Sequence, residues 1–361
     1  MVRNSPRSVI DMPEFEPVRF GIIGCGTASI PVCEAMSRSP LAELAAVHDV
    51  NESLAEDLSR RFQVHMYKHL DDLLNDPLVE AVYIAVPHHL LAPITQKALE
   101  AGKHALTEKP LAIDLDDVDQ LIALAAERER TLGVFYEMRY ASAHAPARWF
   151  VQGGAIGRIV GVRIQTLINK PLSYWQSGYM GRTVNPWRGI KSQAGGGVVL
   201  MNTSHLLDAL MYITGLRVIY VSAEAGNLVS NVEVEDLAAA TLRFDNGAIG
   251  SLIAGAHVFG AEQEEFCQLY GTKGQIRLPD PYGSGPLQMY LKEPWGDFEA
   301  DKWHEIPLDP VQVYSFALED FARAVQCGSP APVDAESARH VLATVLSIYR
   351  SAAEKRTIPV L

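Results

Sequence analysis

A glutamate and a lysine stand side by side at the end of an apolar run, in the segment Thr107-Glu108-Lys109-Pro110. The run Lys103–Leu106 is typical of a β-strand, and Pro110 fixes its own φ and favours an extended conformation at Lys109. The backbone conformation therefore determines the direction of the Lys109 side chain. If this strand is the fifth of a dinucleotide-binding sheet, its carboxyl end faces the crevice where such sheets bind ligands. The alternative is a surface turn that contains an ion pair.

A histidine follows a run of glycines in the second half of the chain. Gly195-Gly196-Gly197 opens a stretch of helical character. In an α-helix, Met201, His205 and Asp208 lie on one stripe, and Asn202 is three residues from the histidine. Of these groups, the imidazole alone has an unperturbed pKa that suits proton transfer near neutrality. A histidine on a leucine-rich helix is more often structural, so both interpretations stay open on these residues.

Two glycines follow the first strand of the chain, in Gly24-Cys25-Gly26-Thr27-Ala28-Ser29. The strand Arg19–Ile23 leads into them and a helix-like stretch follows, which is the context that gives a Gly-x-Gly motif its meaning. Gly24 permits a tight turn, and Gly26 lets the backbone approach a pyrophosphate at the helix N-terminus. Ser29 is small enough for close packing of helix on strand. The glycine pattern is weak support for nucleotide binding when it stands alone.

A carboxylate lies a little over 20 residues beyond these glycines, where the strand Leu41–Val47 ends. Asp49 in this position would bind the ribose hydroxyls of adenosine and repel a 2′-phosphate, so NAD(H) is expected over NADP(H). The alternative for Asp49 is a turn residue at a strand end. With the ends of two further strands, the predicted cofactor-binding residues are Gly24, Gly26, Thr27, Ala28, Asp49, Val86, Pro87, His88, Glu108 and Lys109.

The elements that position these residues alternate between strand and helix over residues 18–140, which predicts a doubly wound parallel sheet, a Rossmann domain. Residues 141–361 are expected to form a second, α+β domain with a large, mostly antiparallel open sheet and helices on one face. Asp245-Asn246-Gly247 between two of its strands is a strong hairpin signal. The last helices are expected at Val313–Gln326 and Asp334–Lys355, and residues 1–17 form an N-terminal extension.

Aromatic and polar side chains are interleaved before the second glycine run, in Tyr174-Trp175-Gln176-Ser177-Gly178-Tyr179. Sugars suit such a surface, because their C–H faces pack on rings while their hydroxyls need hydrogen bonds. Tyr174 and Trp175 are the candidate substrate contacts here. Buried tryptophan and tyrosine are as often core anchors.

Composition excludes several classes of partner. The net charge of −12 argues against nucleic acid, which requires a basic face. No apolar run approaches the roughly 18 residues of a membrane span, and the N-terminal tail lacks the apolar segment of a signal peptide. The four cysteines show no paired spacing and no metal-ligand cluster, so we expect reduced thiols, a cytoplasmic location and no metal.

Several separated motifs together resemble the glucose–fructose oxidoreductase, inositol dehydrogenase and rhizopine catabolism family of nicotinamide-dependent sugar and polyol dehydrogenases. They are Gly24-Cys25-Gly26, Asp49, Val82–His89, Ala101-Gly102-Lys103-His104 and Glu108-Lys109-Pro110. The resemblance covers essentially the whole chain after the tail.

The resemblance implies roles for particular residues. Lys109 would sit beside the nicotinamide and the reacting hydroxyl, and His205 would be the catalytic histidine. From the residues themselves, Asn202 is a candidate to hydrogen-bond the substrate, and Asp208 is a candidate to orient His205 or to contact substrate, with a purely structural role on the helix as the alternative. Trp187 and Arg188 match a family element near the nicotinamide. The implied activity is reversible oxidation of a secondary hydroxyl of a sugar, polyol or related cyclic substrate with NAD. The family also implies a homodimer or homotetramer formed through the open face of the second sheet.

Two positions depart from the family pattern. Met201 replaces the usual aspartate four residues before the histidine, and Glu137 stands where the family usually has asparagine. A substrate range different from that of inositol dehydrogenases is therefore expected. Two alternatives remain within the family: an NAD-dependent glycosidase, and a non-catalytic NAD-binding regulator. Retention of Lys109 and His205 argues against the regulator, and Met201 argues mildly for it.

Overall fold

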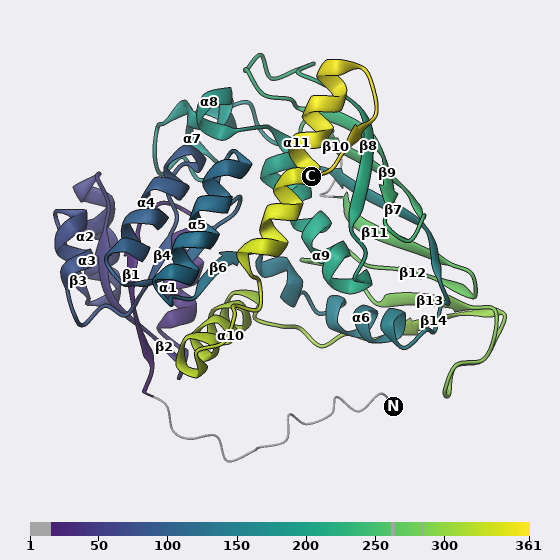
Figure 1. The fold of residues 1–361 in the computed structure, drawn as a ribbon, viewed down its shortest axis with the longest axis horizontal. Coiled ribbons are helices and arrows are strands. Elements are labelled where there is room, and N and C mark those ends of the chain that lie inside the picture. The colour runs from purple at the N-terminus through teal and green to yellow at the C-terminus, as the bar shows by residue number, and fades with distance from the viewer. Residues whose placement is uncertain (1–15, 261–263, 284) are drawn as a thin grey trace.

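The computed structural model describes residues 16–260, 264–283 and 285–361, and it contains two β-sheets with helices packed around them (Figure 1). One sheet has six strands and the other has nine. This confirms the predicted combination of a Rossmann domain with an α+β domain. The predicted N-terminal extension, residues 1–17, lies outside the described residues except for its last two positions.

The six-stranded sheet is parallel throughout, in the order β3-β2-β1-β4-β5-β6. Its central strands β1 and β4 are almost entirely buried, which explains why their sequences are apolar except for Arg19. The strand order reverses between β1 and β4, and in such sheets ligands bind beyond the carboxyl ends of the strands at this point. The strands are β1 (Val18–Ile23), β2 (Ala42–His48), β3 (His65–Met66), β4 (Ala81–Ile84), β5 (His104–Glu108) and β6 (Leu132–Phe135).

The helices of this domain alternate with its strands, as predicted for residues 18–140. They are α1 (Ser29–Met36), α2 (Glu52–Phe62), α3 (Leu70–Asn75), α4 (His88–Glu100) and α5 (Leu115–Glu127). The helix α4 begins at His88, with three residues between it and the end of β4. Pro87 precedes the helix with a φ of −51° and so starts it, which places His88 in the first turn above the sheet.

The nine-stranded sheet has the order β14-β13-β12-β11-β7-β10-β9-β8-β15. Its described pairs are antiparallel except for β7 with β10. The predicted hairpin at Asp245-Asn246-Gly247 joins β9 to β10, and Gly247 adopts a φ of +86° there. The strands are β7 (Ile159–Leu167), β8 (Val218–Gly226), β9 (Leu237–Phe244), β10 (Ile249–Gly255), β11 (Glu264–Gly271), β12 (Gly274–Arg277), β13 (Leu287–Leu291), β14 (Lys302–Ile306) and β15 (Ile358–Pro359).

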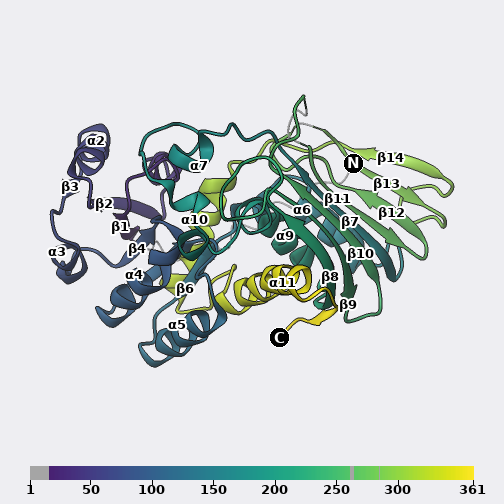
Figure 2. The ribbon, with the colours of Figure 1, turned by 90° about the horizontal axis from the view of Figure 1, so that it is seen from above.

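The two C-terminal helices pack against different parts of the molecule (Figure 2). The helix α10 (Val313–Cys327) packs on the first domain, where Phe321 lies 6.1 Å from Phe20 between ring centroids. The longer helix α11 (Ala335–Glu354) lies against β8 and α5. The nucleotide domain therefore takes part of its hydrophobic core from the end of the chain.

The stretch after the three glycines is not a continuous α-helix. A π-helical turn, η3 (Val199–Thr203), precedes α9 (Ser204–Thr214). The predicted α-helical stripe from Met201 to His205 is therefore wrong in its geometry, because a π turn changes the angle between them. The remaining short helices are η1 (Glu137–Tyr140), α6 (His144–Gln152), α7 (Tyr174–Ser177), η2 (Pro186–Gly189) and α8 (Lys191–Ala194).

Candidate active site

A cleft of about 600 Å³ lies where the strand ends of the first sheet meet the segment 174–188 of the second domain. Cavities of this size hold small molecules and cofactors. All of the predicted cofactor residues line it: Gly24, Gly26, Thr27, Ala28, Asp49, Val86, Pro87, His88, Glu108, Lys109, Trp187 and Arg188. Of the predicted substrate contacts, Lys109 and Tyr174 also line it.

Gly24 and Gly26, the two glycines of the first turn, are needed for different structural reasons. Gly24 has a φ of +93°, and a Cβ there would lie 2.4 Å from the carbonyl oxygen of Ala85. A Cβ on Gly26 would meet nothing within 4 Å, because this residue borders the open cleft. Ser29 is buried, and its hydroxyl donates to the Gly24 carbonyl at 2.5 Å. The turn thus leaves backbone beside the N-terminus of α1 open to a phosphate, which fits a dinucleotide.

Asp49 is held at the rim of the same turn. Its carboxylate accepts hydrogen bonds from the backbone N–H groups of Cys25 and Asn51, each at 2.7 Å. These bonds fix the carboxylate directly beside the glycine turn while it still lines the cleft. The arrangement suits a ribose diol and places negative charge where a 2′-phosphate would approach.

An arginine that the sequence did not indicate joins this rim from the second domain. Arg182 donates to the carbonyl of Cys25 at 3.3 Å and to the carboxylate of Asp57 on α2 at 2.7 Å. It lies more than 120 residues from both partners in the chain, so local sequence patterns carry no signal for this contact. The contact ties the segment 178–185 across the cofactor end of the cleft.

His88 forms part of the middle of the cleft. Its Nδ1 lies 2.7 Å from the carbonyl oxygen of Ala194, and its ring lies 4.6 Å from the ring of Trp187 between centroids. Burial and the charge of Lys109 lower the pKa of His88 to about 3. His88 is therefore uncharged near neutral pH and packs between the two domains. It is no candidate for proton transfer in this pH range.

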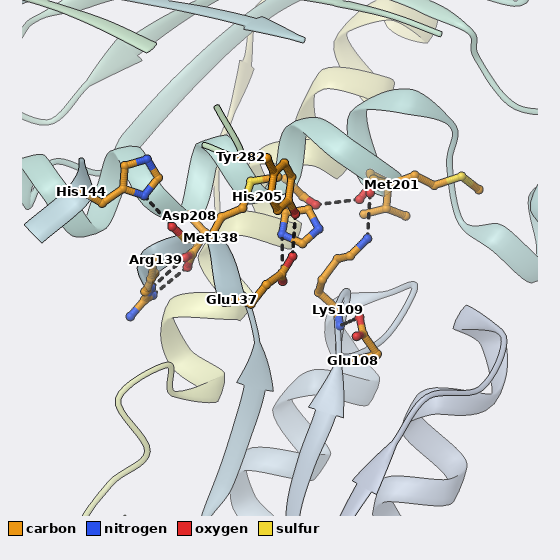
Figure 3. A network of polar contacts seen from close by, with 12 residues as sticks. Glu108, Lys109, Glu137, Met138, Arg139, His144, Met201, His205, Asp208 and Tyr282 are labelled. Carbon is orange, nitrogen blue, oxygen red and sulfur yellow. Dashed lines mark hydrogen bonds and ion pairs between the residues drawn. The ribbon is translucent and has the colours of Figure 1, made fainter. Parts of the chain in front are cut away.

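Lys109 stands at the far end of the cleft from Asp49, directly after β5. Its Nζ donates to the backbone carbonyl of Met201 at 2.7 Å, which brings the first domain against η3 (Figure 3). The preceding Glu108 accepts a hydrogen bond from the Tyr83 hydroxyl at 2.6 Å, and burial raises the pKa of Glu108. The alternative interpretation, an ion pair on a surface turn, does not hold, because the two side chains have separate partners inside the molecule.

His205 lies between Lys109 and Glu137 (Figure 3). The side chain belongs to a residue only 7% exposed, and its Nδ1 has no hydrogen bond partner in the described part of the chain. Burial and the charge of Lys109 hold the pKa of His205 well below its usual value. The imidazole is therefore neutral and can accept a proton, beside a lysine that disfavours its charged form.

Glu137 is the site residue that the sequence marked only as a departure from the family pattern. One carboxylate oxygen lies 3.5 Å from Nδ1 of His205, and the other accepts a hydrogen bond from the Tyr282 hydroxyl at 2.9 Å. Burial, with the nearby Glu108, raises the pKa of Glu137 to about 7. The pair of Glu137 and His205 can therefore share a proton in the neutral range.

Asp208 does not approach His205. Both of its oxygens accept hydrogen bonds from Arg139, at 2.7 Å each, and the residue is 1% exposed (Figure 3). This bidentate pair joins α9 to η1 and leaves the carboxylate turned away from the cleft. The structure therefore gives Asp208 a structural partner, Arg139, which agrees with the structural alternative for this residue.

The other predicted substrate residues divide between the cleft and the core. Tyr174 lines the cleft, and its hydroxyl donates to Sδ of Met201 at 3.5 Å. Trp175 is buried and donates from Nε1 to Nε2 of His257 at 3.3 Å, which is the core role that was its alternative. Asn202 does not line the cleft, and its Oδ1 is buried without a hydrogen bond partner among the described residues.

The three glycines before η3 are required by close packing. A Cβ on Gly196 would lie 2.2 Å from the Tyr349 hydroxyl, and one on Gly197 would lie 1.8 Å from the carbonyl oxygen of Glu235. The buried carboxylate of Glu235 accepts the N–H groups of Gly197 at 2.6 Å and Val199 at 3.0 Å. These contacts fix the start of η3 and so determine where Met201 meets Lys109.

Within the described ranges no cluster of three metal-ligating side chains occurs, and no helix there is long and apolar enough to cross a membrane. The described cysteines are all free thiols.

Comparisons with known proteins identify both domains. Residues 18–136 match the model of an oxidoreductase family with an NAD-binding Rossmann fold, and residues 144–277 match the GFO/IDH/MocA C-terminal domain. The chain is 29% identical to 1,5-anhydro-D-fructose reductase of Ensifer adhaerens over 79% of this chain and 80% of the relative. It is 25% identical to myo-inositol 2-dehydrogenase of Thermotoga maritima, over 94% and 98%.

A solved structure of levoglucosan dehydrogenase in complex with NADH and levoglucosan superposes with a TM-score of 0.84. It is 25% identical to this chain and covers 95% of it and 99% of its own length. The two family models, the curated relatives and this structural match agree over both domains. The chain therefore belongs to the GFO/IDH/MocA family of NAD-binding oxidoreductases.

Proposed function

We propose that the protein is an NAD(H)-dependent dehydrogenase that oxidises, or in reverse forms, a secondary hydroxyl of a sugar, polyol or related cyclic compound. The observation that carries this proposal is the neutral, buried imidazole of His205 next to Lys109, which lines one end of a cleft that suits a dinucleotide, although His205 itself does not line that cleft (Figure 3). The relatives named above support the class of substrate, since they act on carbohydrates and an inositol.

The cofactor supplies the hydride acceptor when it is bound. The glycine turn and Asp49 would hold its adenosine end, and Lys109, Trp187 and Arg188 border the other end. The position of Asp49 supports NAD over NADP, because a 2′-phosphate would meet a carboxylate that two backbone N–H groups hold in place.

His205 would remove the proton of the reacting hydroxyl, or return it in the reverse direction. Lys109 would hydrogen-bond the same oxygen and stabilise the negative charge that develops on it. Glu137 would face Nδ1 of the imidazole and stabilise its charged form after proton transfer. The lysine lowers the proton affinity of His205 before the reaction, and the glutamate offsets this once Glu137 has lost its own proton.

The open face of the nine-stranded sheet supports the proposed self-association. Exposed positions alternate with buried ones along β9 and β10, and several exposed positions of this sheet are large and apolar: Tyr220, Leu237, Ile249, Ile253, Tyr270 and Trp303. A second copy of the chain would cover this face. Light scattering after gel filtration tests this, because a monomeric mass at micromolar concentration would contradict it.

The dehydrogenase proposal is tested by following NADH at 340 nm with NAD or NADP and a panel of neutral sugars, inositols and sugar acids. We expect NADH with one substrate class, and a kcat at least about 100-fold lower in Lys109→Ala. The control is Lys97→Ala, which removes an exposed lysine of α4.

Lys109→Ala turning over at the wild-type rate would contradict the assignment of the lysine. A protein that binds NAD but forms no NADH with any compound of the panel would contradict the dehydrogenase. That result would favour the glycosidase, which cleaves a glycoside without net NADH, or a regulator that only binds the cofactor.

A further inference from the structure

A second lysine lies buried beside the candidate site among aromatic side chains. Lys170 is 1% exposed, no carbonyl or carboxylate of the described residues accepts a hydrogen bond from its Nζ, and the Tyr174 hydroxyl is its polar neighbour. Three aromatic rings surround the ammonium group: its Nζ lies 3.8 Å from the ring centroid of Tyr174, 5.8 Å from Trp175 and 5.7 Å from Tyr179. Such contacts compensate a buried cation only in part.

Another buried lysine of the chain shows how an ammonium group is hydrogen-bonded when its role is purely structural. Lys103 is 8% exposed, and its Nζ donates to the carbonyls of Asp76 and Val79, at 2.7 Å each. Buried polar groups are normally satisfied in this way, and an exception requires a reason. Lys170 has no such carbonyl partners, and it packs against Tyr174, which lines the cleft.

The surroundings of Lys170 are positively charged. Arg188 lies with its Cζ 5.4 Å from the Tyr174 ring, lines the cleft and has no carboxylate partner among the described residues. The charges of Lys109 and Arg188 help burial to lower the pKa of Lys170. The three cations together lower the pKa of Tyr174 to about 8, against the effect of its burial.

Two acidic side chains of this region have other partners. Glu137 faces His205 and Tyr282, and Glu108 faces Tyr83. A third, Glu265, acts on the pKa values of Tyr179 and Tyr282. The residue that packs against the Tyr174 hydroxyl is the uncharged Met201. No ion pair among the described residues joins a carboxylate to Lys170 or Arg188, so the guanidinium of Arg188 borders the cleft without a paired carboxylate.

We propose that the substrate carries a carboxylate, which Arg188 binds from the wall of the cleft while Lys170 holds a second positive charge behind Tyr174. The inference rests on the proposed function, because it assumes that the hydroxyl of the same molecule reacts at Lys109 and His205. A guanidinium can bind a carboxylate with two parallel hydrogen bonds, and a positive cleft concentrates anionic substrates. The substrate class is thus a sugar acid in preference to a neutral sugar.

The test compares matched pairs that differ only in the acid group, such as D-glucuronate with D-glucose and D-galacturonate with D-galactose. We expect the kcat/KM of the acid to exceed that of its neutral counterpart by at least about 10-fold. In Lys170→Met and Arg188→Gln, we expect this acid-to-neutral ratio to fall by about 10-fold or more. The exposed Lys97→Met serves as the control, in which the ratio stays at the wild-type value.

Several outcomes would overturn the inference. Equal losses on both members of a pair, with an unchanged ratio, would make Lys170 a structural residue. A raised Kd for NADH at an unchanged ratio would assign both cations to the cofactor. Faster turnover of D-glucose 6-phosphate than of either acid would assign the site to a phosphate. Arg188 is partly exposed, so its variant tests the inference even if Lys170→Met does not fold.

Failure of the dehydrogenase proposal can be told apart from failure of this inference. If no compound is oxidised, binding of D-glucuronate and D-glucose to the protein with NAD is measured by calorimetry. Tighter binding of the acid that weakens in Arg188→Gln would uphold the carboxylate site and reject the reaction alone. Oxidation of neutral sugars in preference to acids would uphold the reaction and reject the carboxylate site.

Discussion

Two buried polar residues on the same helix differ in how completely they are hydrogen-bonded. His205 and Asp208 are one turn apart on α9, and both are almost fully buried. Asp208 has two short hydrogen bonds from Arg139, whereas Nδ1 of His205 has none and lies 3.5 Å from Glu137 (Figure 3). A complete set of partners indicates a structural role. An incomplete set, beside a cleft, indicates a group that completes its contacts only with a ligand.

The largest effect is expected from replacing His205. His205→Asn should lower kcat by roughly 1,000-fold, because general acid–base catalysis contributes about 10²–10⁴. Its melting temperature should change little, since no hydrogen bond at Nδ1 is lost. Steady-state kinetics and thermal unfolding measure the two effects, with the exposed His65→Asn as the control. A large loss of stability with kcat intact would reverse the roles of His205 and Asp208.

Replacing Asp208 should give the opposite result. Asp208→Asn leaves Arg139 buried without its countercharge, which costs about 3–5 kcal/mol of unfolding free energy. Urea denaturation measures this cost. The loss in kcat of the folded variant should be far smaller than that of His205→Asn. A kcat reduced as strongly as in the histidine variant would show that the carboxylate takes part in the reaction.

Asp49 is an intermediate case, because its carboxylate is held by two N–H groups and still borders the cleft. Asp49→Ser removes the charge that a 2′-phosphate would meet. We expect the ratio of kcat/KM with NADP to that with NAD to rise roughly 30-fold, the equivalent of about 2 kcal/mol. Asp71→Ser, on the exposed side of α3, is the control. An unchanged ratio would mean that Asp49 has no influence on the choice of cofactor.

The smallest effect is expected at Glu137, which has one satisfied oxygen and one that faces His205. Its pKa is raised to about 7, so the carboxylate gains its charge as the pH rises through 7 and then favours protonation of His205. Oxidation by the wild type should therefore accelerate through this range, about 10-fold. In Glu137→Gln this limb of the pH profile should disappear, and Glu127→Gln should retain it.

The same shift affects stability with a definite sign. The folded protein holds the proton of Glu137 more tightly than the unfolded chain, whose glutamates have a pKa of about 4.3. The contribution of Glu137 to stability is complete below that pH and is lost as the pH rises through about 7. The unfolding free energy of the wild type minus that of Glu137→Gln should therefore decrease over this range. A difference that increases with pH would contradict the raised pKa.

The fold was largely predictable because most strands and turns have a signal within a few consecutive residues of the sequence. Buried parallel strands such as β1 and β4 have mainly apolar sequences, and Asn246-Gly247 determines a hairpin within a few residues. The edge strand β14 has no such signal, since its residues are mostly polar and exposed and its pairing comes from β13. The π turn at η3 was missed because it depends on Glu235, which is far away in the chain.

The site was predictable where it lies next to strand ends and glycine turns, as for Gly24, Asp49 and Lys109. Arg182 and Lys170 could not be found in this way. The importance of Arg182 comes from contacts with Cys25 and Asp57, and that of Lys170 from its burial among the rings of Tyr174, Trp175 and Tyr179. Neither property is a pattern in the sequence, because both depend on contacts between residues that are far apart in the chain.

The segment from Tyr174 to Arg188 has a consequence for how ligands bind. It contacts the glycine turn through Arg182 and borders the substrate end through Tyr174 and Arg188. A cofactor that orders this segment also orders the substrate end, so the two ligands are thermodynamically linked. By reciprocity, each ligand must then tighten the binding of the other by the same factor. We therefore expect NADH to lower the Kd of the substrate by the same factor by which the substrate lowers the Kd of NADH.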